Sequence, residues 1–154
     1  MSASKGYLLD TNIVLHFTRA NSPVAAAVEQ QFQLSTSLFR PAICEVTIAE
    51  MWAFAMAQSW GEKRKELLQR TIADLLVIPI GDSRIHLRWA ELRSDARAKG
   101  SAIQHDHNDI WIAATAHVAG MTLLSTDGAA FHPWRGTPWV CVEVLDPKTG
   151  LIVS

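Results

Sequence analysis

Short apolar runs alternate with helical segments along this chain, and this alternation constrains its fold more than any other feature. The runs predict five strands, over residues 6–10, 41–44, 76–80, 121–125 and 139–145. The first run is apolar throughout instead of at every second residue, as in a parallel strand covered on both faces. Strands that alternate with helices predict an α/β fold with a mostly parallel sheet and right-handed crossovers.

Helix signals fill the segments between these runs. Ser22 followed by Pro23 is typical of a helix start, because serine caps the first turn and proline suits its first position. The sequence also predicts helices over residues 45–59, 62–76 and 106–119. A further helix is expected to be capped by Asp82 or Ser83 and to end at Gly100, since glycine favours the residue after a helix.

The length of 154 residues fits one domain, which we place at residues 1–146, followed by a C-terminal tail over residues 147–154. The sequence leaves two possibilities for the tail, a short hairpin that folds back or a free end. The formal net charge is −1, which argues against a protein that holds nucleic acid by bulk charge. Any contact with nucleic acid must then be local, or assisted by a metal ion or a partner.

Secretion and membrane signals are not visible in the sequence. The chain reaches its first strand without a long apolar leader, and its apolar stretches are too short to span a bilayer. Cys44 and Cys141 lack the spacing of a metal site or a redox motif, so we interpret them as reduced thiols. The expectation is a cytoplasmic protein with no membrane partner.

Four acidic residues occupy positions where a carboxylate has little local reason to be: Asp10, Glu50, Asp109 and Asp127. Asp10 ends the first strand, and Asp127 directly follows the fourth. Asp109 lies in the first turn of the helix that leads into the fourth strand, and Glu50 lies in the helix after the second. Sites in such sheets form at the carboxyl ends of the strands, so this topology can bring the four acids to one edge.

Converging carboxylates repel one another, and this repulsion raises some of their pKa values. Mg²⁺ or Mn²⁺ relieves the repulsion, because hard divalent cations prefer oxygen ligands. The acids therefore predict a metal site with Mg²⁺ (or Mn²⁺) as the cofactor. Each acid also has a structural alternative: a strand-end turn for Asp10, a solvated helix face for Glu50, a favourable helix-start charge for Asp109, and a turn with Gly128 for Asp127.

The segments around these acids resemble the four acidic motifs of PIN-domain nucleases. Residues 8–15 resemble the opening strand and turn, and residues 46–50 resemble the second motif. Residues 108–116 closely resemble the third motif, and residues 123–127, with Phe131 shortly after, resemble the fourth. The match covers nearly the whole chain in the right order. A single small domain of this kind is similar to the VapC-type toxins of toxin–antitoxin pairs.

This resemblance implies a three-layer α/β/α fold and an endoribonuclease that hydrolyses RNA phosphodiester bonds with Mg²⁺ or Mn²⁺. It also implies a homodimer and inhibition by a cognate antitoxin protein. The four acids would hold the metal directly or through its waters, and a water activated by the metal would attack phosphorus. Four neighbouring residues are candidates for binding the phosphate or orienting a carboxylate, with local capping as the alternative: Thr11, Asn12, Asp106 and Thr126.

Two other functions stay open. A non-catalytic nucleic-acid-binding or regulatory domain could keep this fold, although the presence of all four acids favours an enzyme. A phosphotransferase or phosphatase could use Asp10 as a nucleophile, but many such enzymes need a second aspartate two residues on, where this chain has Asn12. The sequence has no P-loop or GxGxxG motif, which argues against a nucleotide-cofactor enzyme.

Arginines and tryptophans supply further candidates for contacts. At helical angles, the arginines of residues 84–99 fall into two opposite pairs, Arg84 with Arg88 and Arg93 with Arg97. Either pair could bind backbone phosphates, and a solvated helix face is the plainer alternative. Most of the six tryptophans are expected to pack between layers, and the pair at positions 52 and 60 is the one expected at an interface.

Overall fold

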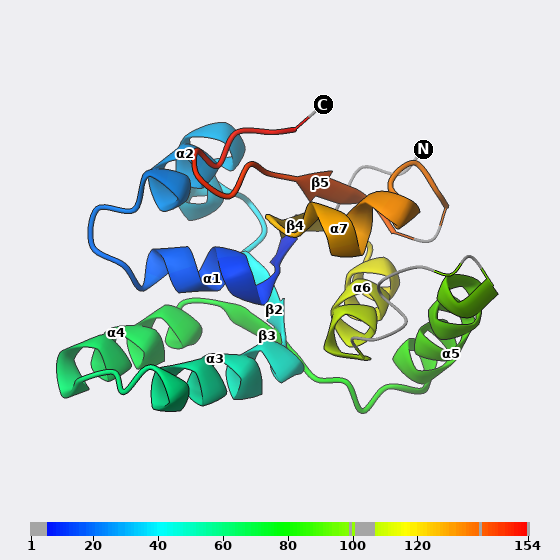
Figure 1. Ribbon diagram of the computed structural model, residues 1–154, viewed down its shortest axis with the longest axis horizontal. Helices are drawn as coiled ribbons and strands as arrows, with labels where there is room; N and C mark the ends of the chain where they lie inside the picture. Colours follow the sequence, from blue (N-terminus) through cyan, green and yellow to red (C-terminus); the bar gives the residue numbers. More distant parts are fainter. Residues whose placement is uncertain (1–5, 99, 101–106, 139, 154) are drawn as a thin grey trace.

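Five parallel strands form the centre of the computed structural model, which describes residues 6–98, 100, 107–138 and 140–153 (Figure 1). The strands are β1 (Tyr7–Leu9), β2 (Ala42–Cys44), β3 (Leu76–Ile78), β4 (Thr122–Ser125) and β5 (Val142–Val144), in the order β3-β2-β1-β4-β5. Leu8 pairs with Ala42 on one side and with Leu123 on the other, so β1 is the central strand. The predicted α/β fold with a parallel sheet is confirmed. The predicted start of the fifth strand at residue 139 lies outside the described residues.

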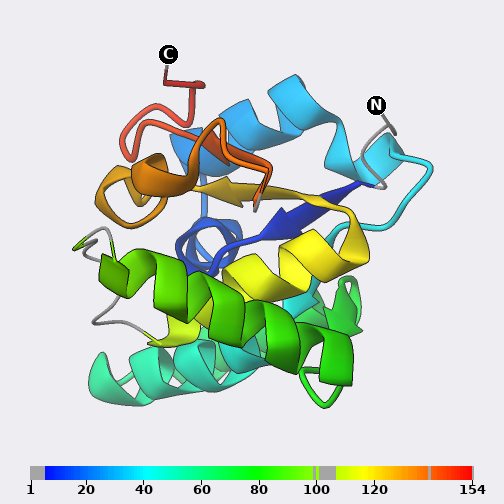
Figure 2. The ribbon, with the colours of Figure 1, turned by 90° about the vertical axis from the view of Figure 1, so that its right-hand side faces the viewer.

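Helices cover both faces of this sheet. The α-helices of the described residues are α1 (Thr11–Phe17), α2 (Pro23–Phe32), α3 (Glu45–Ala57), α4 (Glu62–Ala73), α5 (Ser83–Ala98), α6 (His107–Ala119) and α7 (Gly128–Phe131). Two short 3₁₀ helices, η1 (Leu34–Thr36) and η3 (His132–Trp134), follow α2 and α7. Helices α1 to α4 pack on one face and α5 to α7 on the other, which gives the three layers (Figures 1 and 2).

Alternate residues of each strand face opposite layers, which explains why the runs are apolar without alternation. Leu8 and Leu123 pack in the core on the α5–α6 side, whereas Leu9 and Leu124 pack in the core on the α1–α4 side. All four side chains are at most 1% exposed. Burying each such side chain stabilises the fold by about 1.5–3 kcal/mol. The two cores together hold the sheet and the carboxyl ends of its strands in place.

Several helix boundaries follow from local contacts. Ser22 accepts a hydrogen bond from Ala25 N at 3.2 Å, so the predicted start of α2 is confirmed. Helix α3 ends at Ala57, two residues before the predicted end, and the chain turns at Ser59, where φ is +51°. Helix α4 ends at Ala73 instead of residue 76, because residues 76–78 pair as β3. Helix α7 was not predicted, since a single turn is too short to show helical periodicity.

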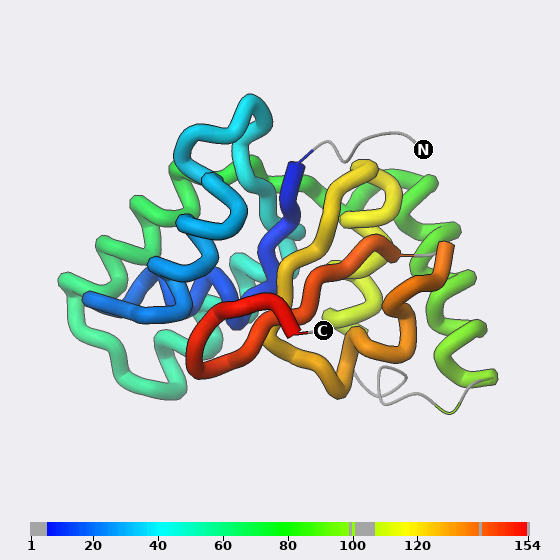
Figure 3. The backbone as a smooth tube through the Cα atoms, turned by 90° about the horizontal axis from the view of Figure 1, so that it is seen from above, coloured from blue at the N-terminus to red at the C-terminus, as the bar shows by residue number. Residues whose placement is uncertain are grey.

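The C-terminal tail folds back as a hairpin, which decides between its two possible conformations. Leu145 and Ile152 form an antiparallel bridge. Gln31 Nε2 donates to the Gly150 carbonyl at 2.6 Å, and Gln31 Oε1 accepts from Ile152 N at 3.2 Å. Gly150 has a φ of +74°, and a Cβ there would lie 2.9 Å from the Val24 carbonyl oxygen, so the turn requires glycine. Figure 3 shows the tail, in red, beside α2.

Candidate active site

Asp10 is the buried centre of the candidate site, at the end of the central strand. Its backbone N–H donates to the Leu124 carbonyl at 2.9 Å, which continues the pairing of β1 with β4. Its side chain is 4% exposed. Asp10 Oδ1 accepts from Thr11 N at 2.8 Å, and Oδ2 accepts from Asn12 Nδ2 at 3.1 Å and from Ser125 Oγ at 2.6 Å. Three hydrogen bonds therefore fix the orientation of this carboxylate.

Glu50 is joined to the same edge through Thr11. Thr11 Oγ1 donates to Glu50 Oε1 at 2.6 Å and lies 3.1 Å from Thr47 Oγ1. Glu50 and Thr47 are three residues apart on α3, so they share one face of that helix. Since Thr11 begins α1 directly after Asp10, its hydroxyl connects the end of β1 to α3. The predicted role of Thr11 in orienting a carboxylate has this contact as its structural basis.

Asp127 lies beside Asp10, directly before α7 and after the end of β4. Its backbone N–H donates to Ser125 Oγ at 2.9 Å, and its Oδ1 accepts from Ala130 N at 3.0 Å, so it caps α7. Asp127 therefore has a local contact as a helix cap, where the structural alternative predicted for it was a turn with Gly128. Thr126 N donates to Asn12 Oδ1 at 3.1 Å. Asn12 thus bridges β4 and Asp10, through its carbonyl on one side and its amide N–H on the other.

The charges of two other acids, Glu50 and Asp127, act on Asp10. Burial raises the pKa of Asp10 from its ordinary value of 3.8 to about 6, the hydrogen bonds from Ser125 and Thr11 oppose this rise, and the charges of Glu50 and Asp127 add to it. Burial is the largest cause, because the charged form loses its hydration. This environment favours a proton on Asp10 below a pH of about 6 and favours a nearby cation above it.

Asp109 lies in the first turn of α6, a helix that runs antiparallel to the strands because it leads directly into β4. In the middle of α6, Thr115 Oγ1 donates to Cys44 Sγ at 3.4 Å, which places that part of the helix at the end of β2. Asp109 is six residues earlier, about 9 Å along the helix axis. Asp109 is half-buried, and this offset from Thr115 places it beyond the carboxyl end of β2. Asp106 lies outside the described residues.

The oxygen donors at this edge fit a hydrated hard cation better than a fully protein-coordinated one. Within residues 6–98, 100, 107–138 and 140–153, no three His, Cys, Asp or Glu side chains lie close enough together to hold one metal ion. Mg²⁺ keeps several of its waters and needs only one or two direct carboxylates. The donor set, which is made of carboxylates and hydroxyls, suits Mg²⁺ or Mn²⁺ and not a soft metal.

Sequence reasoning missed the roles of two hydroxyl residues. Ser125 is fully buried and connects Asp10 to the backbone of Asp127. Thr47 is also fully buried, next to Thr11. The signal that could have found both is a small polar residue inside an apolar segment that leads to an acid. A buried hydroxyl needs a partner, and a neighbouring acid site supplies one.

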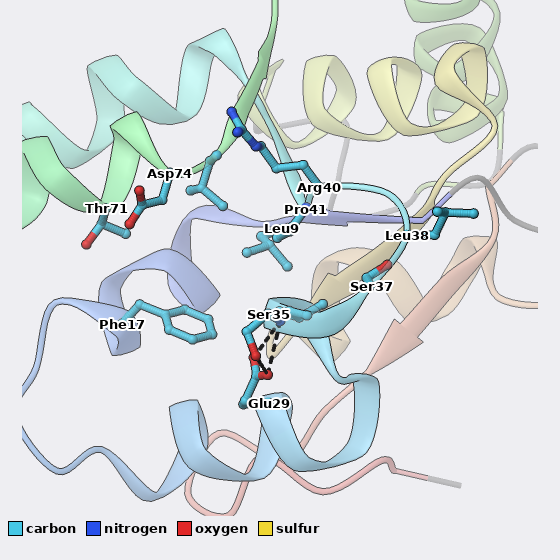
Figure 4. Close-up of a pocket in the computed structure, with 12 residues that line it drawn as sticks. Leu9, Phe17, Glu29, Ser35, Ser37, Leu38, Arg40, Pro41, Thr71 and Asp74 are labelled. Carbon is cyan, nitrogen blue, oxygen red and sulfur yellow. Dashed lines mark hydrogen bonds between the residues drawn. The ribbon is translucent and has the colours of Figure 1, made fainter.

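A cavity of about 580 Å³ lies elsewhere, on the α1–α4 side (Figure 4). Its apolar lining includes Leu9, Phe17 and Leu75, and Glu29 and Asp74 lie among its polar lining residues. None of the four predicted acids lines it. The candidate active site therefore rests on the hydrogen bonds and charges around Asp10, and the position of this cavity does not contribute to it.

Trp52 and Trp60 are the tryptophans expected at an interface, and the structure does not support this expectation for Trp60. Trp60 is 7% exposed and packs edge-on against Phe54, with ring centroids 5.9 Å apart. The Arg64 guanidinium covers its ring at 3.7 Å from the centroid. A side chain that is enclosed in this way belongs to the core of the protein.

A comparison with protein families matches residues 7–132 to the PIN domain. This match covers most of the chain, and the chain belongs to the PIN-domain family. A comparison with curated proteins found no match. None of the helices in the described ranges combines the length and the apolar character that crossing a membrane requires.

Solved structures of toxin–antitoxin complexes share this fold. VapBC2 from Rickettsia felis, bound to a DNA fragment from its promoter, has a TM-score of 0.74 and 21% identity, over 90% of this chain and 98% of that chain. DNA-bound VapBC from Salmonella typhimurium has a TM-score of 0.73 and 22% identity, over 90% and 97%. FitAcB from Neisseria gonorrhoeae has a TM-score of 0.66 and 24% identity, over 88% and 95%. At these identities the likeness establishes the fold.

Proposed function

We propose that this chain is a metal-dependent endoribonuclease and the toxin of a toxin–antitoxin pair. The observation that carries the proposal is the buried Asp10 carboxylate, whose pKa is raised by burial and by the charges of Glu50 and Asp127. Membership of the PIN-domain family and the shared fold with VapBC complexes support it. The proposed cofactor is Mg²⁺ or Mn²⁺, and the proposed partners are an RNA substrate, a cognate antitoxin and a second copy of the chain.

In this proposal, Asp10, Glu50 and Asp109 hold the cation directly or through its waters, and Asp127 completes the site. A bound Mg²⁺ or Mn²⁺ would supply positive charge against the phosphate and lower the pKa of a water. Ser125, Asn12 and the backbone of Thr11 keep Asp10 in one orientation. The Thr11 hydroxyl keeps Glu50 turned toward the same edge. These fixed positions supply the alignment that in-line attack on phosphorus needs.

Replacing Thr11 with valine should lower RNA cleavage by about 10- to 100-fold, which is the usual effect of removing a residue that orients a metal ligand. Valine keeps the shape of threonine but lacks the hydroxyl that donates to Glu50 Oε1. Threonine at position 36, whose hydroxyl contacts only a nearby backbone carbonyl, offers a matched control. Steady-state cleavage rates of Thr11→Val and Thr36→Val test this role, and equal rates would contradict it.

The proposed function is tested by incubating purified, antitoxin-free protein with total cellular RNA and Mg²⁺ or Mn²⁺ and mapping the new ends by sequencing. The wild-type protein should create discrete ends, and Asp109→Asn should create none. Asp82→Asn, at a half-buried aspartate that pairs with Arg84, is the control and should cleave normally. The absence of discrete ends with folded wild-type protein would favour the alternative, a non-catalytic nucleic-acid-binding or regulatory domain.

A further inference from the structure

Helix α1 lies along α3 and α4, and the two ends of this contact carry opposite charge (Figure 1). At the acid edge, Thr11 donates to Glu50 at 2.6 Å. At the far end, just beyond the last residue of α1, the charge of Arg19 acts on Arg64 in the first turn of α4. Helix α1 is about 10 Å long, so the positive end is a separate place on the molecule.

The Arg64 side chain is fixed in position but lacks hydrogen-bond partners. Its guanidinium stacks on the Trp60 ring at 3.7 Å from the centroid. Within the part of the chain that the structure describes, Nε and Nη2 of Arg64 are buried and make no hydrogen bond. Buried donors without a partner are costly and rare in folded proteins. The side chain as a whole is only half-buried, so a ligand with acceptor oxygens can approach it from solvent.

The charge of Arg64 is not balanced by an acid. Burial lowers the pKa of Arg64 below its usual range, and the positive charge of Arg19 lowers it further. Among residues 6–98, 100, 107–138 and 140–153, Arg19 is the one charged group that acts on Arg64. Glu62 is also in the first turn of α4, but its carboxylate pairs with Lys65 at 3.5 Å. Two positive charges therefore face each other here with no described carboxylate to offset them.

The start of α4 adds further donors at the same place. The first turn of a helix has backbone N–H groups that lack intrahelical acceptors. Gly61, the residue before α4, has no side chain to accept from them. The Arg64 guanidinium lies over Trp60, directly before Gly61, so it reaches back toward these N–H groups. The free N–H groups and the positive end of the helix dipole both favour an anion at this point.

We propose that Arg19, Arg64 and the first turn of α4 bind a phosphate group with two negative charges. Inorganic phosphate, nucleotides and the phosphorylated ends of RNA chains all present such a group. Its charge of about −1.5 to −2 at pH 7 matches two guanidiniums, whereas a single carboxylate would leave one positive charge unbalanced. A guanidinium also matches phosphate in shape, because its planar fork can donate to two oxygens at once.

A phosphate bound here would connect the helices that hold the acid edge. Arg19 follows α1, whose first residue Thr11 contacts Glu50 on α3. Arg64 belongs to α4 and packs on Trp60, in the segment that joins α3 to α4. The bound group should therefore stabilise the folded protein, since it contacts elements that come together only on folding. This site is distinct from the acid edge and does not depend on the nuclease function.

The test measures binding of inorganic phosphate to metal-free protein by isothermal titration calorimetry, with the ionic strength held constant by NaCl. Arg19→Gln and Arg64→Gln should each weaken phosphate binding about 10-fold or more, the usual effect of removing a hydrogen bond to a charged group. Arg64→Lys keeps the charge but loses the planar fork, so its affinity should lie between those of the wild type and Arg64→Gln. Arg70→Gln, at an exposed arginine of the same helix, is the matched control and should bind like the wild type.

Arg19→Gln keeps the test decisive if Arg64→Gln unfolds, because Arg19 is exposed and its loss leaves the packing on Trp60 unchanged. Circular dichroism of each variant checks the fold. The proposal is overturned if the wild type binds phosphate no more tightly than chloride. It is also overturned if the folded Arg19 and Arg64 variants bind phosphate as tightly as the wild type does.

A second arm identifies the source of the phosphate, with Asp10→Asn as the background so that RNA stays intact. It compares one short RNA with a 5′-phosphate and with a 5′-hydroxyl. Tighter binding of the phosphorylated form, lost in Arg64→Gln, assigns the site to an RNA end. Equal binding of the two RNAs, with inorganic phosphate still bound, assigns it to a free phosphate compound. Since phosphate binding is measured without cleavage, failure of the nuclease function leaves this result unaffected.

Discussion

Asp10→Asn should abolish RNA cleavage while leaving the protein folded, and should also remove a pH-dependent loss of stability. The carboxylate is the centre of the proposed site, and asparagine cannot replace its charge. The same charge is costly in the absence of a cation, because the side chain is 4% exposed and lies near Glu50 and Asp127. Function and stability therefore respond to this one substitution in opposite directions.

The direction of the pH effect follows from the pKa of Asp10, which rises from 3.8 to about 6 on folding. Between these two values the folded state binds more protons than the unfolded state, so the free energy of unfolding falls as pH rises. The stability is fully present below pH 3.8 and is lost as pH rises through about 6. The whole loss corresponds to about 3 kcal/mol.

Urea unfolding of the wild type and Asp10→Asn across this pH range measures the effect. As pH rises through this range, the free energy of unfolding of the wild type should fall by about 3 kcal/mol relative to that of the variant. The side-chain amide of the variant also carries an N–H group, which faces one of the three donors that now hydrogen-bond to Asp10. Because two donors cannot pair, this contact costs about 1–3 kcal/mol at every pH. Asp82→Asn is the control for cleavage. Full activity in Asp10→Asn, or parallel stability curves, would contradict the assignment.

Mn²⁺ or Mg²⁺ should stabilise the wild-type protein at pH values above the pKa of Asp10 and should be required for turnover. A ligand that binds only the folded state adds about 2.7 kcal/mol at a concentration of one hundred times its Kd. A cation also offsets the repulsion between Asp10 and the neighbouring acids, so the pKa of Asp10 should fall when it binds. The stabilisation should diminish at lower pH, where the proton competes for the same carboxylate.

Thermal unfolding with increasing Mn²⁺ tests this expectation at two pH values, one above and one below about 6. Tm should rise with concentration in the wild type at the higher pH, rise less at the lower pH, and stay constant in Asp10→Asn. EDTA should stop RNA cleavage, and Mn²⁺ added in excess of EDTA should restore it. Undiminished cleavage in EDTA would exclude a readily removed metal cofactor.

Much of the fold was predictable because its signals are local. The central strand is buried between two cores, as Leu8 and Leu9 show, and this requires an apolar run without alternation. The start of α2 follows from the hydrogen bond of Ser22, which depends on residues only three positions apart. Helix α7 and the tail hairpin were not predictable, because a single turn has no periodicity and the tail depends on Gln31, which lies more than a hundred residues away.

Asp10 and Asp127 were predicted from their places at strand ends, and Glu50 and Asp109 from their places on helices that can reach the same edge. The hydrogen-bond network around them was not predicted. The sequence does not show that Ser125 holds Asp10, because that contact spans 115 residues and depends on the register of β1 against β4. It does not show that Thr11 reaches Glu50 either, because this contact depends on how α3 packs against the start of α1. Side chains that orient a ligand become visible only when the tertiary structure is known.

The position of β1 between β2 and β4 also has a consequence for the newly made chain on the ribosome. The first acid is synthesised early, but its hydrogen-bond partners Ser125 and Asn12 are in place only after β4 has emerged and paired. Pairing between segments so distant in sequence forms late, because the intervening chain must first be ordered. A growing polypeptide of this sequence therefore carries no assembled acid centre until translation has passed β4, and any nuclease activity would begin only after nearly the whole domain exists.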